Sequence, residues 1–104
     1  MKKIKNHIVT IEELSHFKNE YLLRLLKQTM LDTNRELIHK TIANNCYEKM
    51  KGKMKCGLVE LYRLPIEVLE ILHYDLLKDD EDHKYTVIQA IRAKIKNYVF
   101  RQYK

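Results

Sequence analysis

Four lysines alternate with other residues in the segment Lys-Met-Lys-Gly-Lys-Met-Lys, which covers positions 49–55. In an extended hairpin, alternate side chains lie on the same face, so these lysines would form a row of charge that can contact a DNA backbone. In a helix end followed by a loop, the same lysines are simply solvated. Lys-Gly is also a poor two-residue hairpin turn compared with Asn-Gly. Both interpretations of the segment stay open at this point.

A second basic pattern lies near the C-terminus, where apolar residues trace the stripe of an amphipathic helix. Arg92 and Lys96 flank this stripe on one side, and two further basic residues flank it on the other. Such a helix can lie along a phosphate backbone or enter a major groove. It can equally be an ordinary amphipathic helix whose lysine stems cover the edge of the core. The candidate nucleic-acid-binding residues are therefore Lys49, Lys51, Lys53, Lys55, Arg92, Lys94, Lys96 and Arg101.

Two cysteines and five histidines are of the types that bind zinc, but their spacing does not fit a zinc site. Cys46 and Cys56 belong to no Cys-x-x-Cys pair, and no histidine stands at ligand spacing to either. Nothing in the sequence suggests secretion, so we expect reduced thiols. Cys46 is predicted to be a small buried hydrophobe, and Cys56, beside Gly57, to be more exposed. We predict neither a metal site nor a disulfide.

Catalytic motifs are also not found. The chain has no glycine-rich phosphate loop, no nucleophile elbow and no His-Glu-x-x-His sequence. Arg35 and His39 share one face of a predicted helix and could cleave RNA in principle, but such a pair is common by chance. The sequence therefore predicts a protein that is not an enzyme and that uses no cofactor and no small-molecule substrate.

The charge is unevenly distributed along the chain. Residues 58–83 hold eight of the fourteen acidic residues and only two basic ones, a net charge of −6. Because the whole chain carries +6, the remaining residues carry +12. A basic field this concentrated attracts polyanions, and nucleic acid is the commonest of these. The acidic stretch is expected to cap the last helix and to pair with basic neighbours, although it could also mimic nucleic acid for another protein.

The elements that must position these residues are predicted to be helices. Thr10 to Glu13 forms a capping box, and the apolar residues after it predict a helix that ends at about residue 30 or 31. Thr33 and Glu36 form a second capping box. The helix that they start should end at Gly52, which we expect to supply a left-handed residue after the last turn.

The second half of the chain predicts a short helical turn and two more helices. The turn covers residues 58–62, and Pro65 fits the first turn of the next helix. Aspartates of the charged segment 78–83 can cap the last helix. The apolar stripe of that last helix is predicted to contain Tyr85, Ile88, Ile91, Ile95, Tyr98 and Val99.

The segment Leu22-Leu23-Arg24-Leu25-Leu26 is apolar over more than half of the helix circumference. Four leucines in this arrangement cannot all face the core of a small domain. We therefore predict that Leu23 is covered by a dimer partner, by another protein or by a second helix, since single-domain proteins avoid large exposed apolar patches. The candidate partner-binding residues are Leu22, Leu23 and Leu26.

Length and composition limit the fold. A chain of 104 residues forms one domain with a modest core. Two glycines and one proline are too few for the tight turns of an all-β fold. No apolar run approaches the roughly 18–20 residues of a membrane span. We predict one all-α domain over residues 1–104, a compact bundle of four to five helices with at most a small β-hairpin near residue 52, located in the cytoplasm.

The function that these features favour is non-enzymatic nucleic-acid binding, with DNA preferred over RNA. Lysine outnumbers arginine fifteen to five, which points to AT-rich codons and to a regulatory or accessory factor of a low-GC bacterium, plasmid or phage. The alternative is a protein-interaction module, a small inhibitor or adaptor whose partner is a larger protein or a second copy of the chain. Neither function involves a membrane.

Overall fold

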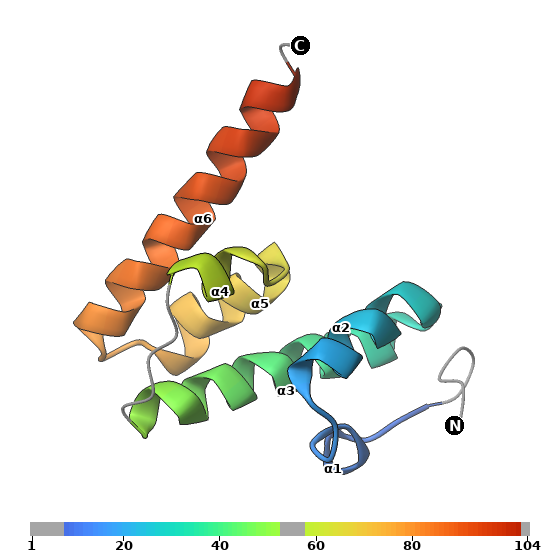
Figure 1. Ribbon diagram of the computed structural model, residues 1–104. Coiled ribbons are helices and arrows are strands. Elements are labelled where there is room, and N and C mark those ends of the chain that lie inside the picture. Colours follow the sequence, from blue (N-terminus) through green and yellow to red (C-terminus); the bar gives the residue numbers. More distant parts are fainter. Residues whose placement is uncertain (1–7, 53–57, 103–104) are drawn as a thin grey trace. The chain divides into compact units, whose positions relative to one another are not determined.

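The computed structural model describes residues 8–52 and 58–102, and in residues 98–102 it describes the backbone alone. Over these residues the chain is mostly helical and contains no strand (Figure 1). The prediction of an all-α chain is confirmed for this part of the sequence. The hairpin considered near residue 52 falls partly on residues 53–57, which lie outside the described residues.

Six α-helices and one π-helical segment follow one another in the described residues. The elements are α1 (Ile11–Leu14), α2 (Asn19–Gln28), α3 (Asp32–Lys51), α4 (Leu58–Tyr62), α5 (Ile66–Ile71), the π-helical segment η1 (Leu72–Leu76) and α6 (Glu81–Gln102). The prediction of four to five helices is close to this arrangement. The difference comes from the first predicted helix, which the structure divides in two.

The helices gather into two compact units. Unit 1 comprises residues 1–45 and unit 2 comprises residues 46–104, so the boundary falls inside α3. Each unit is a continuous stretch of sequence. That the two units behave as one domain, as the length of the chain suggests, stays a prediction.

In unit 1, α1 and α2 replace the single helix that the sequence predicts from residue 11 to residue 30 or 31. Thr10 caps α1 as expected, because its side-chain oxygen accepts a hydrogen bond of 3.2 Å from the Glu13 amide. The helix then ends after one turn. The Ser15 hydroxyl donates to the Glu12 carbonyl at 2.7 Å, and Lys18 adopts extended backbone angles before α2 begins. A serine that bonds to its local backbone favours such an interruption.

Hydrogen bonds between distant residues hold unit 1 together. The Val9 amide donates to Oδ1 of Asn34 at 3.1 Å, and Asn34 is fully buried. Asn45 donates to Oδ1 of Asn19 at 2.9 Å. A buried amide side chain is costly unless it is bonded, so the contact with Val9 explains how the core accommodates Asn34. The largest fully buried apolar side chains of unit 1 are Leu14, Leu22, Leu25, Ile38 and Ile42.

The limits of α3 confirm one predicted signal and correct two details. The helix begins at Asp32, so Thr33 lies within the first turn and is not its cap. It ends at Lys51, directly before Gly52, whose amide still donates to the Glu48 carbonyl at 3.0 Å. Gly52 is thus the predicted stop, but its φ angle lies outside the left-handed region. The glycine ends the helix without the conformation that usually makes it necessary.

In unit 2, α4, α5 and η1 all pack against α6. Pro65 precedes α5 with φ −60° and ψ 149°, which places it at the cap position, one residue before the first turn where the sequence predicts it. The proline has no amide proton to leave unpaired there. The buried apolar side chains of the helices in this unit include Leu61, Val68, Leu69, Leu72, Val87 and Ala90.

The π-helical segment η1 is a feature that the sequence does not predict. The Leu77 amide donates to the carbonyl of Leu72, five residues earlier, at 2.8 Å. Both leucines are fully buried. In an α-helix, residues five apart point in directions that differ by roughly 140°, so Leu77 would turn away from the face of Leu72. The wider turn brings both side chains to the same core.

None of the helices in residues 8–52 and 58–102 is long and apolar enough to cross a membrane.

Candidate nucleic-acid interface on α6

The side of α6 that faces the rest of unit 2 carries small residues. Val87 and Ala90 are fully buried, and α4, α5 and η1 all contact this helix. An α-helix turns by about 100° per residue. Positions 85, 89, 92 and 96 therefore lie together on the face opposite to Val87 and Ala90. We call these four residues the outer face of α6.

The outer face is polar, basic and accessible. Tyr85 is 64% exposed, Gln89 is half-buried, and Arg92 and Lys96 are exposed. Within the described residues, neither basic side chain makes a hydrogen bond or an ion pair. A phenol, an amide and two cations on one helical face are groups that contact phosphates and base edges. The two charges are thus available to a ligand.

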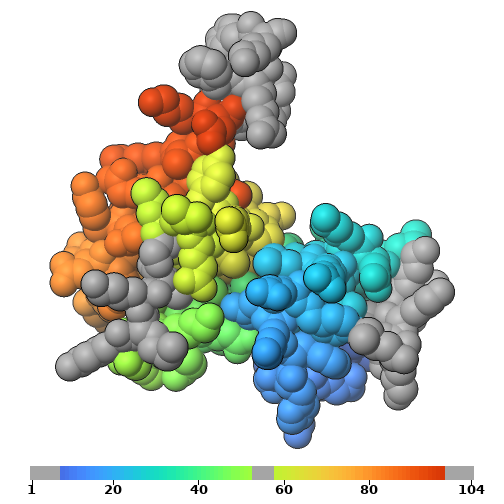
Figure 2. Space-filling view, in the orientation of Figure 1, coloured from blue at the N-terminus to red at the C-terminus, as the bar shows by residue number. Residues whose placement is uncertain are grey.

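The C-terminal part of α6 extends beyond α4 and α5 in the ribbon view (Figure 1), and the preceding part of the helix lies at the surface beside α4 (Figure 2). The side chains of α6 also become more exposed towards its C-terminus. Ala90 is the last fully buried side chain described, and Ile95 is 50% exposed. The sequence from residue 84 to residue 104 contains six basic residues and no acidic one. From residue 84 onward α6 carries charge of one sign, so this part of the helix can approach a polyanion without repulsion from neighbouring carboxylates, which lie in its first turn.

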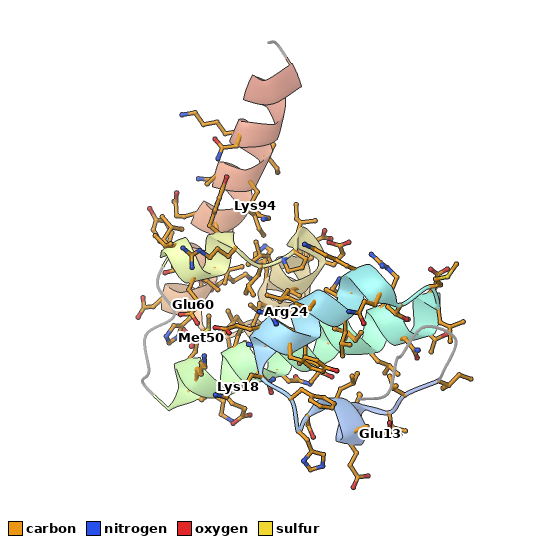
Figure 3. The ribbon with its side chains drawn as sticks, turned by 45° about the vertical axis from the view of Figure 1, so that its right-hand side comes forward. Glu13, Lys18, Arg24, Met50, Glu60 and Lys94 are labelled. Atoms are coloured by element: carbon orange, nitrogen blue, oxygen red, sulfur yellow. The ribbon has the colours of Figure 1, made fainter. Side chains whose placement is uncertain are left out.

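Lys94 has a structural role, although the sequence places it among the candidate binding residues. Nζ of Lys94, which is labelled in Figure 3, donates to the Tyr62 carbonyl at 2.8 Å and lies 5.1 Å from the centre of the Tyr62 ring. Asn97 also donates to the Tyr62 hydroxyl. A cation at the last residue of α4 bonds one of the carbonyls that a helix end leaves unpaired, and it suits the negative end of the helix dipole. Lys94 therefore attaches α4 to α6.

Lys49 and Lys51 lie in the last turns of α3, which excludes an extended hairpin for these two positions. Residues two apart in a helix point in directions that differ by roughly 200°, so the two lysines do not form one row. Lys49 pairs with Glu60 at 3.5 Å, and Lys51 pairs with Glu48 at 3.8 Å. Pairs this exposed are weak. Both lysines can therefore exchange a carboxylate for another anion.

The other candidate basic residues lie wholly or partly outside the described residues. Lys53 and Lys55 belong to the segment 53–57, and only the backbone of Arg101 is described, within α6. Of the eight candidates, the structure therefore brings Arg92 and Lys96 to one free face. It places Lys94 in an internal contact and Lys49 and Lys51 in surface ion pairs.

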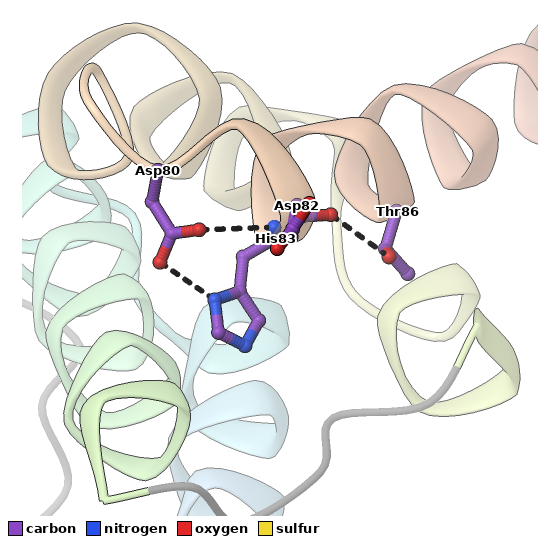
Figure 4. A network of polar contacts seen from close by, with 4 residues as sticks. All are labelled: Asp80, Asp82, His83 and Thr86. Atoms are coloured by element: carbon purple, nitrogen blue, oxygen red, sulfur yellow. Dashed lines mark hydrogen bonds and ion pairs between the residues drawn. The ribbon is translucent and has the colours of Figure 1, made fainter.

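The acidic segment before α6 caps the helix, as the sequence predicts. Oδ1 of Asp80 accepts from the His83 amide at 3.2 Å, and Nδ1 of the His83 ring lies 2.6 Å from Oδ2 (Figure 4). The side-chain hydrogen bond and then the amide hydrogen bond from His83 lower the pKa of Asp80 below its ordinary value of 3.8. Thr86 donates to the Asp82 carbonyl at 3.4 Å, which adds a contact in the same turn.

The leucines proposed for partner binding are mostly buried. Leu22 is fully buried and Leu26 is 7% exposed, while Leu23 is half-buried. Among these three side chains, a partner protein would have only part of Leu23 to contact. The exposed apolar side chains of the described residues lie elsewhere, and they are Ile8, Ile11, Phe17, Met30, Leu58, Val59, Tyr74, Tyr85 and Ile95.

The thiol and metal predictions are tested only in part. Cys46 is 1% exposed, which confirms that it lies in the interior. Cys56 falls in the segment 53–57, outside the described residues. In the part of the chain that the structure describes, no group of three or more histidine, cysteine or acidic side chains could hold a metal ion.

The residues on the core side of α6 differ from those of the predicted apolar stripe. That stripe runs from Tyr85 through the isoleucines, whereas Val87 and Ala90 are fully buried and Tyr85 and Ile95 are exposed. Large apolar side chains suggest the core more strongly than small ones do. The spacing of Val87, Ala90 and Lys94 carries the alternative signal, because two small residues in line allow another helix to approach closely.

Comparisons with protein-family models, with curated proteins and with solved structures find no match to this chain.

Proposed function

We propose that this protein binds DNA without catalysing a reaction, and that the outer face of α6 makes the central contact. The observation that carries the proposal is the exposure of Arg92 and Lys96 on one face of a helix that has no acidic residue from position 84 onward. A regulatory or accessory role, in a low-GC bacterium, plasmid or phage, fits a small chain of this charge.

Electrostatics gives the proposal its first measurable consequence. Each phosphate that a lysine or arginine neutralises releases a counterion, so the affinity falls as the salt concentration rises. Residues 84–104 supply six basic residues, of which Lys94 is engaged with Tyr62. We therefore expect a steep salt dependence with any duplex, and a weak dependence on base sequence.

The test is the binding of a labelled random duplex of about 25 base pairs, followed by fluorescence anisotropy between about 50 and 200 mM salt. Replacing Arg92 and Lys96 together by glutamine removes two phosphate contacts. The slope of log affinity against log salt should then fall by about 1.8 units, at roughly 0.9 for each phosphate. The affinity at about 50 mM salt should fall by at least tenfold.

The matched control is the double variant Lys18→Gln/Lys27→Gln, which removes the same charge from exposed positions of unit 1. The control should leave the slope nearly unchanged. An equal loss in both variants would show that only net charge matters and would overturn the role of the outer face. No binding of either duplex DNA or RNA at about 50 mM salt would overturn the function itself.

A second candidate function is a protein-interaction module, a small inhibitor or adaptor of a larger protein. The observation in its favour is the short helix α4, which exposes two adjacent apolar residues, Leu58 and Val59, the latter at 68%. Binding that persists at high salt and fails after Val59→Glu would distinguish this function, since apolar contacts are screened far less than phosphate contacts.

A further inference from the structure

The isoleucines of α6 are its largest aliphatic side chains, yet they do not lie in the core. Ile88 and Ile91 are half-buried and Ile95 is 50% exposed, whereas Val87 and Ala90 are fully buried. A buried isoleucine stabilises a fold much more than an exposed one does. The helix therefore carries apolar surface that the described residues of the chain do not cover.

These isoleucines follow one another at the spacing of a helix-pairing seam. The steps from 88 to 91 and from 91 to 95 are three and four residues, which is the repeat that keeps one stripe facing a partner helix. At about 100° per residue, the stripe lies roughly a quarter turn from the face of Val87 and Ala90. It lies between that core face and the outer face, so a second helix can reach it.

The distribution of charge along α6 indicates the charge pattern and the orientation that a partner helix needs. The start of α6 is acidic, because Glu81 and Asp82 follow two further aspartates, and no acid occurs from residue 83 to residue 104. A parallel pair of such helices would place like charges together. An antiparallel pair places the acidic start of one helix beside the basic end of the other. Like charges repel and opposite charges attract at these distances.

We propose that a second copy of this chain covers the isoleucine stripe, with the two α6 helices antiparallel in a homodimer. The register that fits the seam sets Ile91 of one protomer against Ile95 of the partner subunit. A partner helix must supply an apolar stripe and a complementary charge at each end. A second copy of α6 supplies both. No other partner chemistry is needed.

The dimer also extends the proposed DNA binding, and this extension rests on the proposed function. The isoleucine stripe and the outer face lie on neighbouring sides of α6, so pairing through the stripe leaves Arg92 and Lys96 open. Each dimer then carries two basic outer faces related by a twofold axis. Symmetric dimers of this kind bind two half-sites on a duplex.

The test is the mass of the full chain in solution, measured by sedimentation equilibrium from about 1 to 500 μM, a range that covers weak and moderate dimers. The expected mass at the upper end is twice 12.6 kDa. Ile91→Glu should raise the dissociation constant of the dimer by at least about 30-fold, the effect of losing one central contact. Met30→Glu introduces the same charge at an exposed position of unit 1 and should leave it unchanged.

A charge exchange tests the antiparallel arrangement separately. Glu81→Lys/Asp82→Lys should weaken the dimer at least tenfold. Adding Arg101→Glu to that variant should strengthen the dimer again by at least about threefold, because the end of one helix then again carries a charge opposite to the reversed start of the other. Circular dichroism checks that each variant remains helical.

Three results would overturn the dimer. They are a monomer at every concentration, an unchanged dissociation constant in Ile91→Glu with a folded spectrum, and a failure of the second charge reversal to restore binding. None of them bears on DNA binding by the monomer. Conversely, a dimer that binds no DNA would overturn the proposed function and leave the pairing of α6 intact.

Discussion

At the scale of single residues, two buried threonines differ in whether their hydroxyl group is satisfied. Thr29, at 4% exposed, has a hydroxyl oxygen that is buried and makes no hydrogen bond with any residue the structure describes. Thr41, at 2% exposed, donates its hydroxyl to the Leu37 carbonyl at 2.8 Å. A buried polar group without a partner destabilises the fold, and a bonded one is close to neutral or favourable.

Valine has nearly the shape of threonine and no hydroxyl, so it separates these two cases. Thr29→Val should raise the free energy of unfolding by about 1 kcal/mol, because it removes an unsatisfied group. Thr41→Val should lower it by about 1 kcal/mol, because the Leu37 carbonyl loses a donor. Urea denaturation measures both. Equal shifts in the same direction would show that the hydroxyl at Thr29 is satisfied in solution.

The Asp80 cap predicts a dependence of stability on pH. Its folded pKa is lowered by the two hydrogen bonds from His83, so the cap stabilises the fold above the ordinary pKa of 3.8. The stabilisation disappears as the pH falls through the lower, folded pKa. Asp80→Ala should therefore cost about 1 kcal/mol at pH 7, the usual value of a helix cap. The difference from the unmodified protein should shrink as the pH falls below 3.8 and through the lower, folded pKa.

Thermal denaturation between about pH 7 and about pH 2 measures this difference. Asp79→Ala serves as the control, since Asp79 is exposed and does not cap α6. The control should change stability by less than about 0.5 kcal/mol, as surface substitutions usually do. A constant cost of Asp80→Ala over the whole pH range would contradict the role of the ionised carboxylate.

At the scale of elements, the sequence predicts best what local chemistry decides. Thr10, Pro65 and Asp80 each start a helix near the place where they were expected, and Gly52 ends one. In each case the cause is a hydrogen bond or a missing amide within a few residues. Such effects can be read from a short window of sequence.

Features that depend on distant residues were not predictable in the same way. Which face of α6 is buried depends on where α4 and α5 pack, and no spacing within α6 contains that information. The role of Lys94 depends on Tyr62, 32 residues earlier. The sequence therefore identifies α6 as a helix rich in basic residues, but it does not distinguish the engaged Lys94 from the exposed Arg92 and Lys96.

The π-helical segment η1 predicts an unusual tolerance to deletion. Tyr74 lies within η1 and is 63% exposed. Its deletion would leave Leu77 four residues after Leu72 and on the same face of an ordinary α-helix. We expect this variant to fold, with a melting temperature within about 5 °C of the original, which corresponds to about 1 kcal/mol.

The comparison is the deletion of Gln89, a half-buried residue of α6. This deletion rotates Ala90 by about 100° relative to Val87 and removes one of them from the core. Its melting temperature should fall by more than about 10 °C. Equal losses from the two deletions, measured by circular dichroism, would contradict the explanation of η1.

At the scale of the whole molecule, both units carry the same net positive charge. Residues 1–45 hold eight basic and five acidic residues, and residues 46–104 hold twelve and nine, so each unit carries a net charge of +3. In unit 2, acidic and basic residues lie in separate stretches of the sequence, whereas in unit 1 they alternate more closely. In the proposed function, the total charge raises the rate of encounter with DNA, and the charge separation within unit 2 selects the face that contacts it.

The division into continuous units also has a consequence for the order in which the protein is made. The contacts of Val9 with Asn34 and of Asn19 with Asn45 all close within residues 1–45. At about 5–20 residues per second, a ribosome needs roughly 3–12 s to add residues 46–104. Small helical structures form in microseconds to milliseconds. The first unit can therefore complete its own contacts long before the helix with the outer face has been synthesised.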